Sequence, residues 1–211
     1  MEFSHWLSLF TVCLLGAISP GPSLAVVLGN TLRQGRAAGL AAAFAHGFGV
    51  GLYGLITVSG LALVMTGSPR AFAAIQMAGA GYLIYLGVRG LRSSHSGASA
   101  GLSEGGGESS RGSALSGFLV AFLNPKLAVF MLALFSQFLG PGTDWTVKGI
   151  MVLTVGLTDA GWYALVAAMA SHPQAIDWLR QREQLIDRVL ALVLLTLGTV
   201  VLARALMALG G

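Results

Sequence analysis

Two proline-containing motifs interrupt long apolar stretches of this sequence. They are Ser19-Pro20-Gly21-Pro22 and Asn124-Pro125-Lys126. Because proline removes a backbone hydrogen bond and clashes with the preceding turn, each motif should open its helix for about one turn. Opened backbone presents N–H groups and a positive helix end to an anion such as a carboxylate. The alternative is a kink that serves packing alone.

Three ionisable residues lie in apolar surroundings, where a charge needs a partner. Lys126 belongs to the second motif, and Asp159 and His46 each stand within an otherwise uncharged stretch. Ionisable groups inside a membrane indicate functional sites by default. Two structural alternatives remain: Asp159 and Lys126 could form an ion pair without a further role, and His46 could be a hydrogen-bonded interior histidine.

A zwitterion, with one carboxylate and one ammonium group, matches this set of residues. The backbone after Pro22 and after Pro125, helped by Lys126, is expected to bind the carboxylate. Asp159 is expected to bind the ammonium group. Since burial disfavours the charged form of a carboxyl group, Asp159 is also the first candidate for exchanging protons, and His46 is the second.

The composition places these groups within a membrane. Of 211 residues, 55% are hydrophobic and 9% are charged, whereas a soluble domain carries about 25% charged residues. The 12 Lys and Arg residues are scattered, which argues against a nucleic-acid-binding surface. One cysteine, Cys13, and four histidines make a poor metal site, and no cofactor is expected. We therefore expect an integral membrane protein with a single domain, residues 1–211.

The uncharged stretches predict an all-α membrane protein with six transmembrane helices, since a span needs about 20 residues. The helices are expected near residues 3–29, 38–66, 70–90, 114–139, 147–170 and 187–209. The proline motifs break the first and the fourth of these. At a rise of about 1.5 Å per residue, several of the groups above fall near mid-membrane and should lie close together. They are Gly21, His46, Pro125 and Asp159.

A stretch rich in Gly and Ser, residues 93–113, is expected to be a flexible cytoplasmic linker. It divides the chain into two three-helix halves, residues 1–92 and 114–211, which would insert in opposite orientations as an inverted repeat. The first, third and fifth loops hold most of the Lys and Arg residues, so they are expected to be cytoplasmic. Both termini are then expected outside the cytoplasm.

The glycine-rich segment 47–54 (GFGVGLYG) is not expected to bind a dinucleotide. It follows no predicted strand, and no acidic residue comes about 20 residues later. Its small residues instead allow close packing of helices. Exposed faces of this kind are also compatible with a homodimer.

Four stretches of the chain resemble the LysE/RhtB family of bacterial amino-acid exporters. They are ISPGPSLAVVLGNTLRQGRAAGLAAAFAHGFGVGLY at 18–53, GAGYLIYLGVRGLR at 79–92, GFLVAFLNPKLAVFMLALFSQF at 117–138 and TDAGWY at 158–163. The resemblance implies a six-helix inner-membrane carrier, not an enzyme, that expels amino acids such as lysine, homoserine, threonine or leucine in exchange for protons. The family motifs match Pro20, Gly21, Pro22, Asn124, Pro125, Lys126 and Asp159, whereas the role of His46 rests on its position alone.

Other classes of protein fit the sequence less well. A metal or inorganic-cation exporter would need more ligands, and an intramembrane enzyme would need a second catalytic aspartate or a suitable Ser–His pair. A membrane scaffold that transports nothing also stays open. Residues 7–18 could be the core of a signal peptide, but no basic residue precedes them and Pro20 should hinder cleavage. We therefore expect amino-acid export by alternating access, with the two halves rocking against each other in the bilayer.

Overall fold

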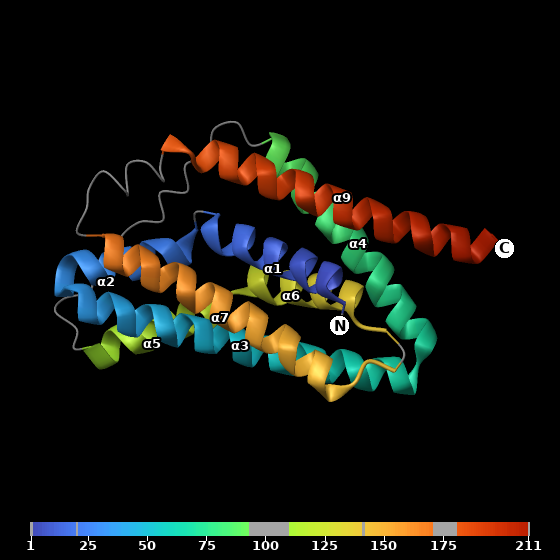
Figure 1. Ribbon diagram of the computed structural model, residues 1–211, viewed down its shortest axis with the longest axis horizontal. Helices are drawn as coiled ribbons and strands as arrows, with labels where there is room; N and C mark the ends of the chain where they lie inside the picture. The colour runs from blue at the N-terminus through green and yellow to red at the C-terminus, as the bar shows by residue number, and fades with distance from the viewer. Residues whose placement is uncertain (1, 20, 93–109, 141, 171–180, 211) are drawn as a thin grey trace.

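The computed structural model describes residues 2–19, 21–92, 110–140, 142–170 and 181–210, and every regular element within them is an α-helix (Figure 1). The helices are α1 (Phe3–Ile18), α2 (Pro22–Gln34), α3 (Arg36–Gly67), α4 (Pro69–Arg92), α5 (Ser110–Phe122), α6 (Pro125–Phe138), α7 (Trp145–Met169) and α9 (Glu183–Gly210). The all-α prediction is confirmed for these residues.

Four of the described helices are long and apolar enough to cross a membrane. They comprise Arg36–Gly67, Arg70–Arg89, Trp145–Met169 and Gln184–Ala203. Two further spans result if the bent pairs α1–α2 and α5–α6 each count as one, which gives up to six. The protein is therefore a multi-pass membrane protein. Figure 1 places the turn between α3 and α4 and the last turns of α9 toward one end of the bundle, and the turn between α2 and α3 at the other.

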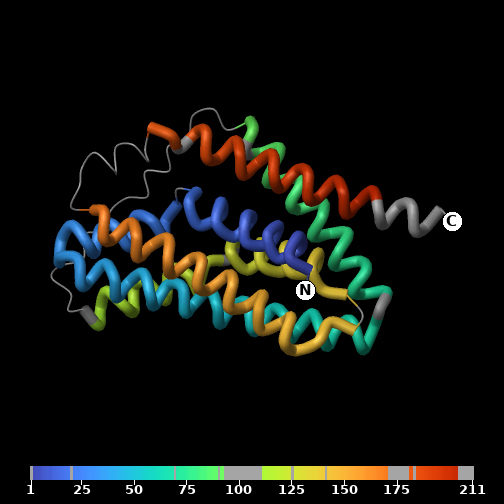
Figure 2. The backbone as a smooth tube through the Cα atoms, in the orientation of Figure 1, coloured from blue at the N-terminus to red at the C-terminus, as the bar shows by residue number. Residues whose placement is uncertain are grey.

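Helices from the two predicted halves pack against one another. Helix α3 packs against α5 and α7, α4 packs against α6 and α9, and α1 packs against α7. In each of these pairs one partner precedes the predicted linker and the other follows it. The two halves therefore share a common core, and the tube in Figure 2 shows α1, α3 and α7 running alongside one another.

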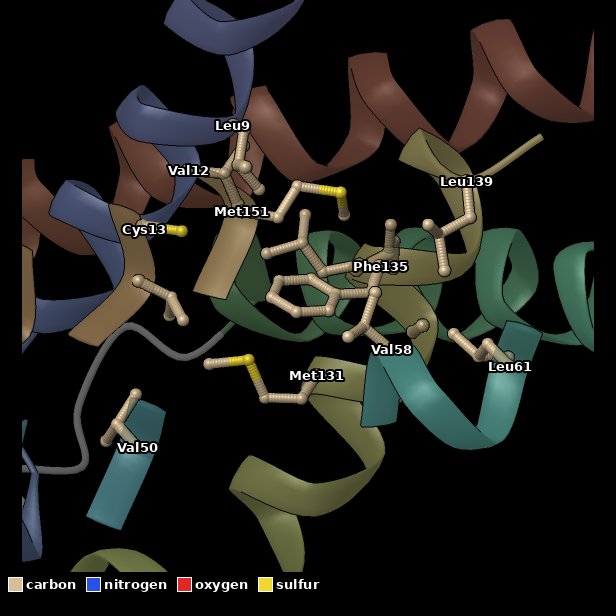
Figure 3. Packing of buried hydrophobic residues seen from close by; sticks show 14 of the residues in the cluster. Leu9, Val12, Cys13, Val50, Val58, Leu61, Met131, Phe135, Leu139 and Met151 are labelled. Carbon is tan, nitrogen blue, oxygen red and sulfur yellow. The ribbon is translucent and has the colours of Figure 1, made fainter. Parts of the chain in front are cut away.

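The largest apolar cluster lies where α1, α3, α6 and α7 meet (Figure 3). Leu9 of α1, Val58 of α3, Phe135 of α6 and Met151 of α7 are fully buried within it. Between helices in a lipid environment, close van der Waals contact replaces the hydrophobic effect as the main stabilising interaction. Shape complementarity therefore decides which helices lie together.

Glycines of α3 supply much of this complementarity. A Cβ atom at Gly47 would lie 2.5 Å from Cβ of Ala160 and 2.8 Å from its Cα, closer than real contacts allow. At Gly117 of α5 it would overlap the backbone of Ala42. The glycine-rich segment thus serves helix packing, as predicted, and it draws α3 against α7 beside His46 and Asp159.

The predicted linker extends too far at its C-terminal end. Helix α5 begins at Ser110, within the predicted range 93–113. Ser113 is fully buried and its hydroxyl donates to Oε1 of Gln34 at 3.1 Å, so this turn packs against the end of α2. Residues 93–109 lie outside the described residues.

Candidate functional site

The first proline motif breaks the first span between α1 and α2. Helix α1 ends at Ile18, α2 begins at Pro22, and the two are bent by 58°. Pro22 stands in the first turn of α2, where its missing N–H group has no helical acceptor to lose. Gly21 before it is extended, with φ −165° and ψ −174°. The predicted break is confirmed, and Pro20 lies outside the described residues.

The N-terminus of α2 carries no side-chain cap. The amide groups of Ser23 and Leu24, in the first turn, have no acceptor within the helix because of their position. A Cβ atom built on Gly21 would meet nothing within 4 Å, so the backbone borders open space here. Uncapped N–H groups together with the positive end of the helix favour an anion at this point.

A buried histidine–aspartate pair lies next to this N-terminus. Nδ1 of His46 on α3 is 2.5 Å from Oδ2 of Asp159 on α7, and the two residues are 3% and 9% exposed. Nε2 of His46 is 2.8 Å from the hydroxyl of Ser23. The ring of Tyr163, also buried, meets the imidazole edge-on at 4.9 Å. Three helices thus bring the first break, a base and an acid into one hydrogen-bonded row.

The second proline motif breaks the fourth span between α5 and α6, with a bend of 57°. Here the residue before the proline caps the helix. Oδ1 of Asn124 accepts hydrogen bonds from the backbone N–H groups of Lys126 at 3.0 Å and Leu127 at 3.3 Å. The N–H groups that sequence analysis assigns to a carboxylate are therefore already satisfied, as expected of an Asn N-cap.

Lys126 does not join the buried pair. Lys126 is exposed in the structure. Among the described residues, Asp159 is paired with His46. The ion pair between Asp159 and Lys126, considered above as an alternative, is therefore wrong for this structure. The reason is the packing of α7, which lies against α3 and α1.

A second acidic residue reaches the first break from α9. The hydroxyl of Ser19, the last residue before the break, donates to Oδ1 of Asp187 at 2.7 Å. Asp187 is half-buried in the second turn of α9. Sequence analysis placed it at the start of the last span and gave it no role, because nothing in the sequence brings α9 beside α1.

Two other residues of the site were missed. Ser23 directly follows the first motif, so its place in the first turn of α2 was a usable signal. Tyr163 is four residues after Asp159, a spacing that puts both on one face of a helix. Each could have been added to the predicted site from the sequence alone.

Polar side chains tie the broken spans to their neighbours at two further points. Nδ2 of Asn30, near the end of α2, is 3.2 Å from the Ser116 hydroxyl on α5. Nε2 of Gln76 on α4 donates to the carbonyl of Ser136 on α6 at 2.7 Å. The second broken span is thus held on both sides of its break, to α2 through Ser116 and to α4 through Ser136.

The row Ser23–His46–Asp159 has the connectivity of a hydrolytic triad, with a hydroxyl on one imidazole nitrogen and a carboxylate on the other. A Ser–His pair of the kind that an intramembrane enzyme would need is therefore present. The same row can also pass a proton between a carboxylate and a hydroxyl through the ring. Among the described residues no three His, Cys, Asp or Glu side chains are grouped to hold a metal ion.

Comparison with known proteins relates the chain to one family. The model of the LysE type translocators matches residues 14–205. A homoserine/homoserine lactone efflux protein of Salmonella typhimurium is 27% identical over 172 residues, 79% of this chain and 82% of the relative. The chemotactic transduction protein ChpE of Pseudomonas aeruginosa is 30% identical over 186 residues, 85% and 87% of the two chains. No solved structure matches the chain.

Proposed function

Because the chain belongs to the family of LysE-type translocators, we propose that it exports amino acids or close derivatives from the cytoplasm in exchange for protons. The name of the Salmonella relatives, homoserine/homoserine lactone efflux protein, supports this substrate class. The observation that carries the proposal is the contact of the uncapped first turn of α2 with the buried His46–Asp159 pair.

At this contact, each charged group of an amino acid lies near a protein group of opposite charge or polarity. The N–H groups of Ser23 and Leu24, at the positive end of α2, bind the carboxylate. Asp159 binds the ammonium group. Residues 19–24 and Asp159 thus form the main binding site. Of the second break, Asn124, Pro125 and Lys126, the charge of Lys126 contributes from a distance, because Asn124 caps the helix that begins at Pro125.

The substrate ammonium group and a proton compete for the carboxylate of Asp159, and this competition couples export to proton entry. In the empty carrier a proton is held between His46 and Asp159. An ammonium group that binds Asp159 on the cytoplasmic side displaces this proton. When the substrate leaves on the periplasmic side, a proton from outside takes its place, so that one substrate moves out as one proton moves in.

Alternating access requires that the helices around the site move as bodies. We propose six spans as an inverted repeat, in the inner membrane, with both termini periplasmic. The glycine contact of α3 with α7, which lies between the two halves, is the surface at which rocking occurs. The tie between Asn30 and Ser116 must open for substrate to enter from the cytoplasm.

Counterflow in proteoliposomes tests the proposal. Wild-type protein should exchange radiolabelled homoserine and should also export it against a gradient when a pH difference is imposed. Asp159→Asn should lose both activities. Asp144→Asn is the matched control on the same helix, because Asp144 only caps α7 through Val147 and Asn caps as well. Wild-type rates in Asp159→Asn would remove Asp159 from the mechanism.

The same experiment separates a carrier from a hydrolase. The Ser23–His46–Asp159 row makes hydrolysis of an ester or lactone the second candidate function. Mass spectrometry of the exchanged compound distinguishes the two. Unmodified homoserine lactone on the far side supports the carrier, whereas homoserine produced from the lactone only when Ser23 is intact would indicate the enzyme.

A further inference from the structure

The first break touches two acidic residues that lie on different helices. Ser23 leads through His46 to Asp159 on α7, and Ser19 donates directly to Asp187 on α9 at 2.7 Å. The proposed function uses only the first of these acids. Asp187 has no role in binding the α-carboxylate or the α-ammonium group.

The segment that links the two hydroxyl groups is short, and Gly21 within it borders open space. Ser19 and Ser23 are four residues apart, so their Cα atoms are separated by at most about 14 Å. Gly21 between them is extended and borders open space. In the chain, Gly21 stands between Ser23, which contacts His46, and Ser19, which contacts Asp187, and the open space beside it can take the side chain of a bound amino acid.

The carboxylate of Asp187 favours substrates with particular side chains. An ionised carboxylate only accepts hydrogen bonds, and the hydroxyl of Ser19 fills one of its acceptor positions. A hydroxyl or ammonium group on the substrate can fill another. A methyl group on the substrate donates no hydrogen bond. It would remove water from the half-buried carboxylate of Asp187 without replacing the lost hydrogen bond, and this desolvation is unfavourable.

We propose that Asp187 and Ser19 form the side-chain subsite of the carrier, and that the preferred substrates are amino acids whose side chains end in a hydrogen-bond donor. The proposal rests on the proposed function. It gives the site a second acidic residue besides Asp159. Hydroxyl-bearing and amine-bearing side chains are accepted, and purely apolar ones are rejected.

Three compounds of equal length test the subsite. Norvaline, homoserine and 2,4-diaminobutyrate end in methyl, hydroxyl and ammonium, and each is used as radiolabelled substrate for counterflow in proteoliposomes. Wild-type protein should favour the last two over norvaline by at least about tenfold, the value of one hydrogen bond to a charged group. Asp187→Asn should keep the preference for the hydroxyl and lose that for the ammonium group, because an amide still accepts a hydrogen bond.

A second variant removes the acceptor altogether. Asp187→Leu should exchange norvaline as fast as homoserine. An unchanged ranking of the three compounds in Asp187→Leu would overturn the subsite. Exchange of all three at equal rates by wild-type protein would also overturn it while leaving amino-acid export intact. Failure of wild-type protein to exchange any of them would contradict the proposed function itself.

Discussion

The two broken spans have nearly the same shape and different chemistry. Their bends are 58° and 57°, and each second helix begins with a proline. At the first break the helix end is uncapped and lies against the buried His46–Asp159 pair. At the second, Asn124 satisfies the helix end. A proline thus opens a span, and the residue before it decides whether the opened backbone is left for a ligand.

The difference between glycine and asparagine explains this outcome. The side-chain oxygen of asparagine accepts hydrogen bonds from the first turn, which stabilises a helix by about 1 kcal/mol relative to alanine. Gly21 has no side chain, so the N–H groups behind it are available to a carboxylate. The first break therefore suits binding of an anion, and the second suits a stable bend.

The largest effect should follow from changing the base at the first break. His46→Gln keeps hydrogen-bonding groups beside Ser23 and Asp159 but cannot exchange protons near neutral pH. Export driven by a pH difference should fall by at least about tenfold, about 1.4 kcal/mol, while exchange of substrate for substrate continues. The exposed His5 on α1 offers the control His5→Gln. Equal losses of both activities would show that His46 only supports the structure.

The next effect should come from separating α3 and α7 beside that base. In Gly47→Ala the new methyl group meets Ala160, and overpacking of this kind costs about 1–3 kcal/mol. Thermal unfolding in detergent can be monitored by the labelling of the buried Cys13 with a thiol-reactive dye, and its midpoint temperature should be lower than in wild-type protein. Gly60→Ala on the same helix, where a Cβ meets nothing within 4 Å, should not shift it.

A smaller effect is expected when the N-cap residue of α2 at the first break is replaced by asparagine, the residue that caps α6 at the second break. In Gly21→Asn the new side chain can cap α2 and compete with the substrate carboxylate, so affinity should fall by about fivefold, equivalent to about 1 kcal/mol. Gly21→Ala has no capping oxygen and should bind substrate like wild-type protein. Binding can be measured by the concentration dependence of counterflow. Equal affinities in the Asn and Ala variants would contradict the assignment of the carboxylate.

Much of this comparison could be predicted from the sequence. The two breaks follow from local chemistry, because proline acts on its own turn wherever the helix lies. The convergence of Gly21, His46 and Asp159 follows from counting residues along apolar stretches, since each residue adds a fixed rise. Both arguments need no knowledge of which helix lies beside which.

The partners within the site could not be predicted in the same way. His46 and Lys126 were both expected near the depth of Asp159, and hydropathy does not distinguish between them. The choice depends on the close contact of Gly47 with Ala160, which brings α3 against α7. The position of Asp187 beside Ser19 depends in turn on where α9 lies relative to α1. Shape complementarity between helices decides both, and it is not visible as a pattern along the chain.

The smallest effect is expected at the second break, where the charge of Lys126 lies outside the buried pair. Sequence analysis gives this residue a part in binding the carboxylate, and that remains a prediction. Because Asn124 occupies the N–H groups of α6, Lys126 can contribute only by attraction over a distance, which salt weakens. Lys126→Ala should therefore raise the half-saturating concentration of homoserine by no more than about threefold, less than 1 kcal/mol, and high salt should reduce the difference from wild-type protein. Lys126→Arg keeps the charge and should behave as wild type. A loss of affinity of about tenfold or more, insensitive to salt, would mean that Lys126 touches the substrate and that the second break binds the carboxylate as well.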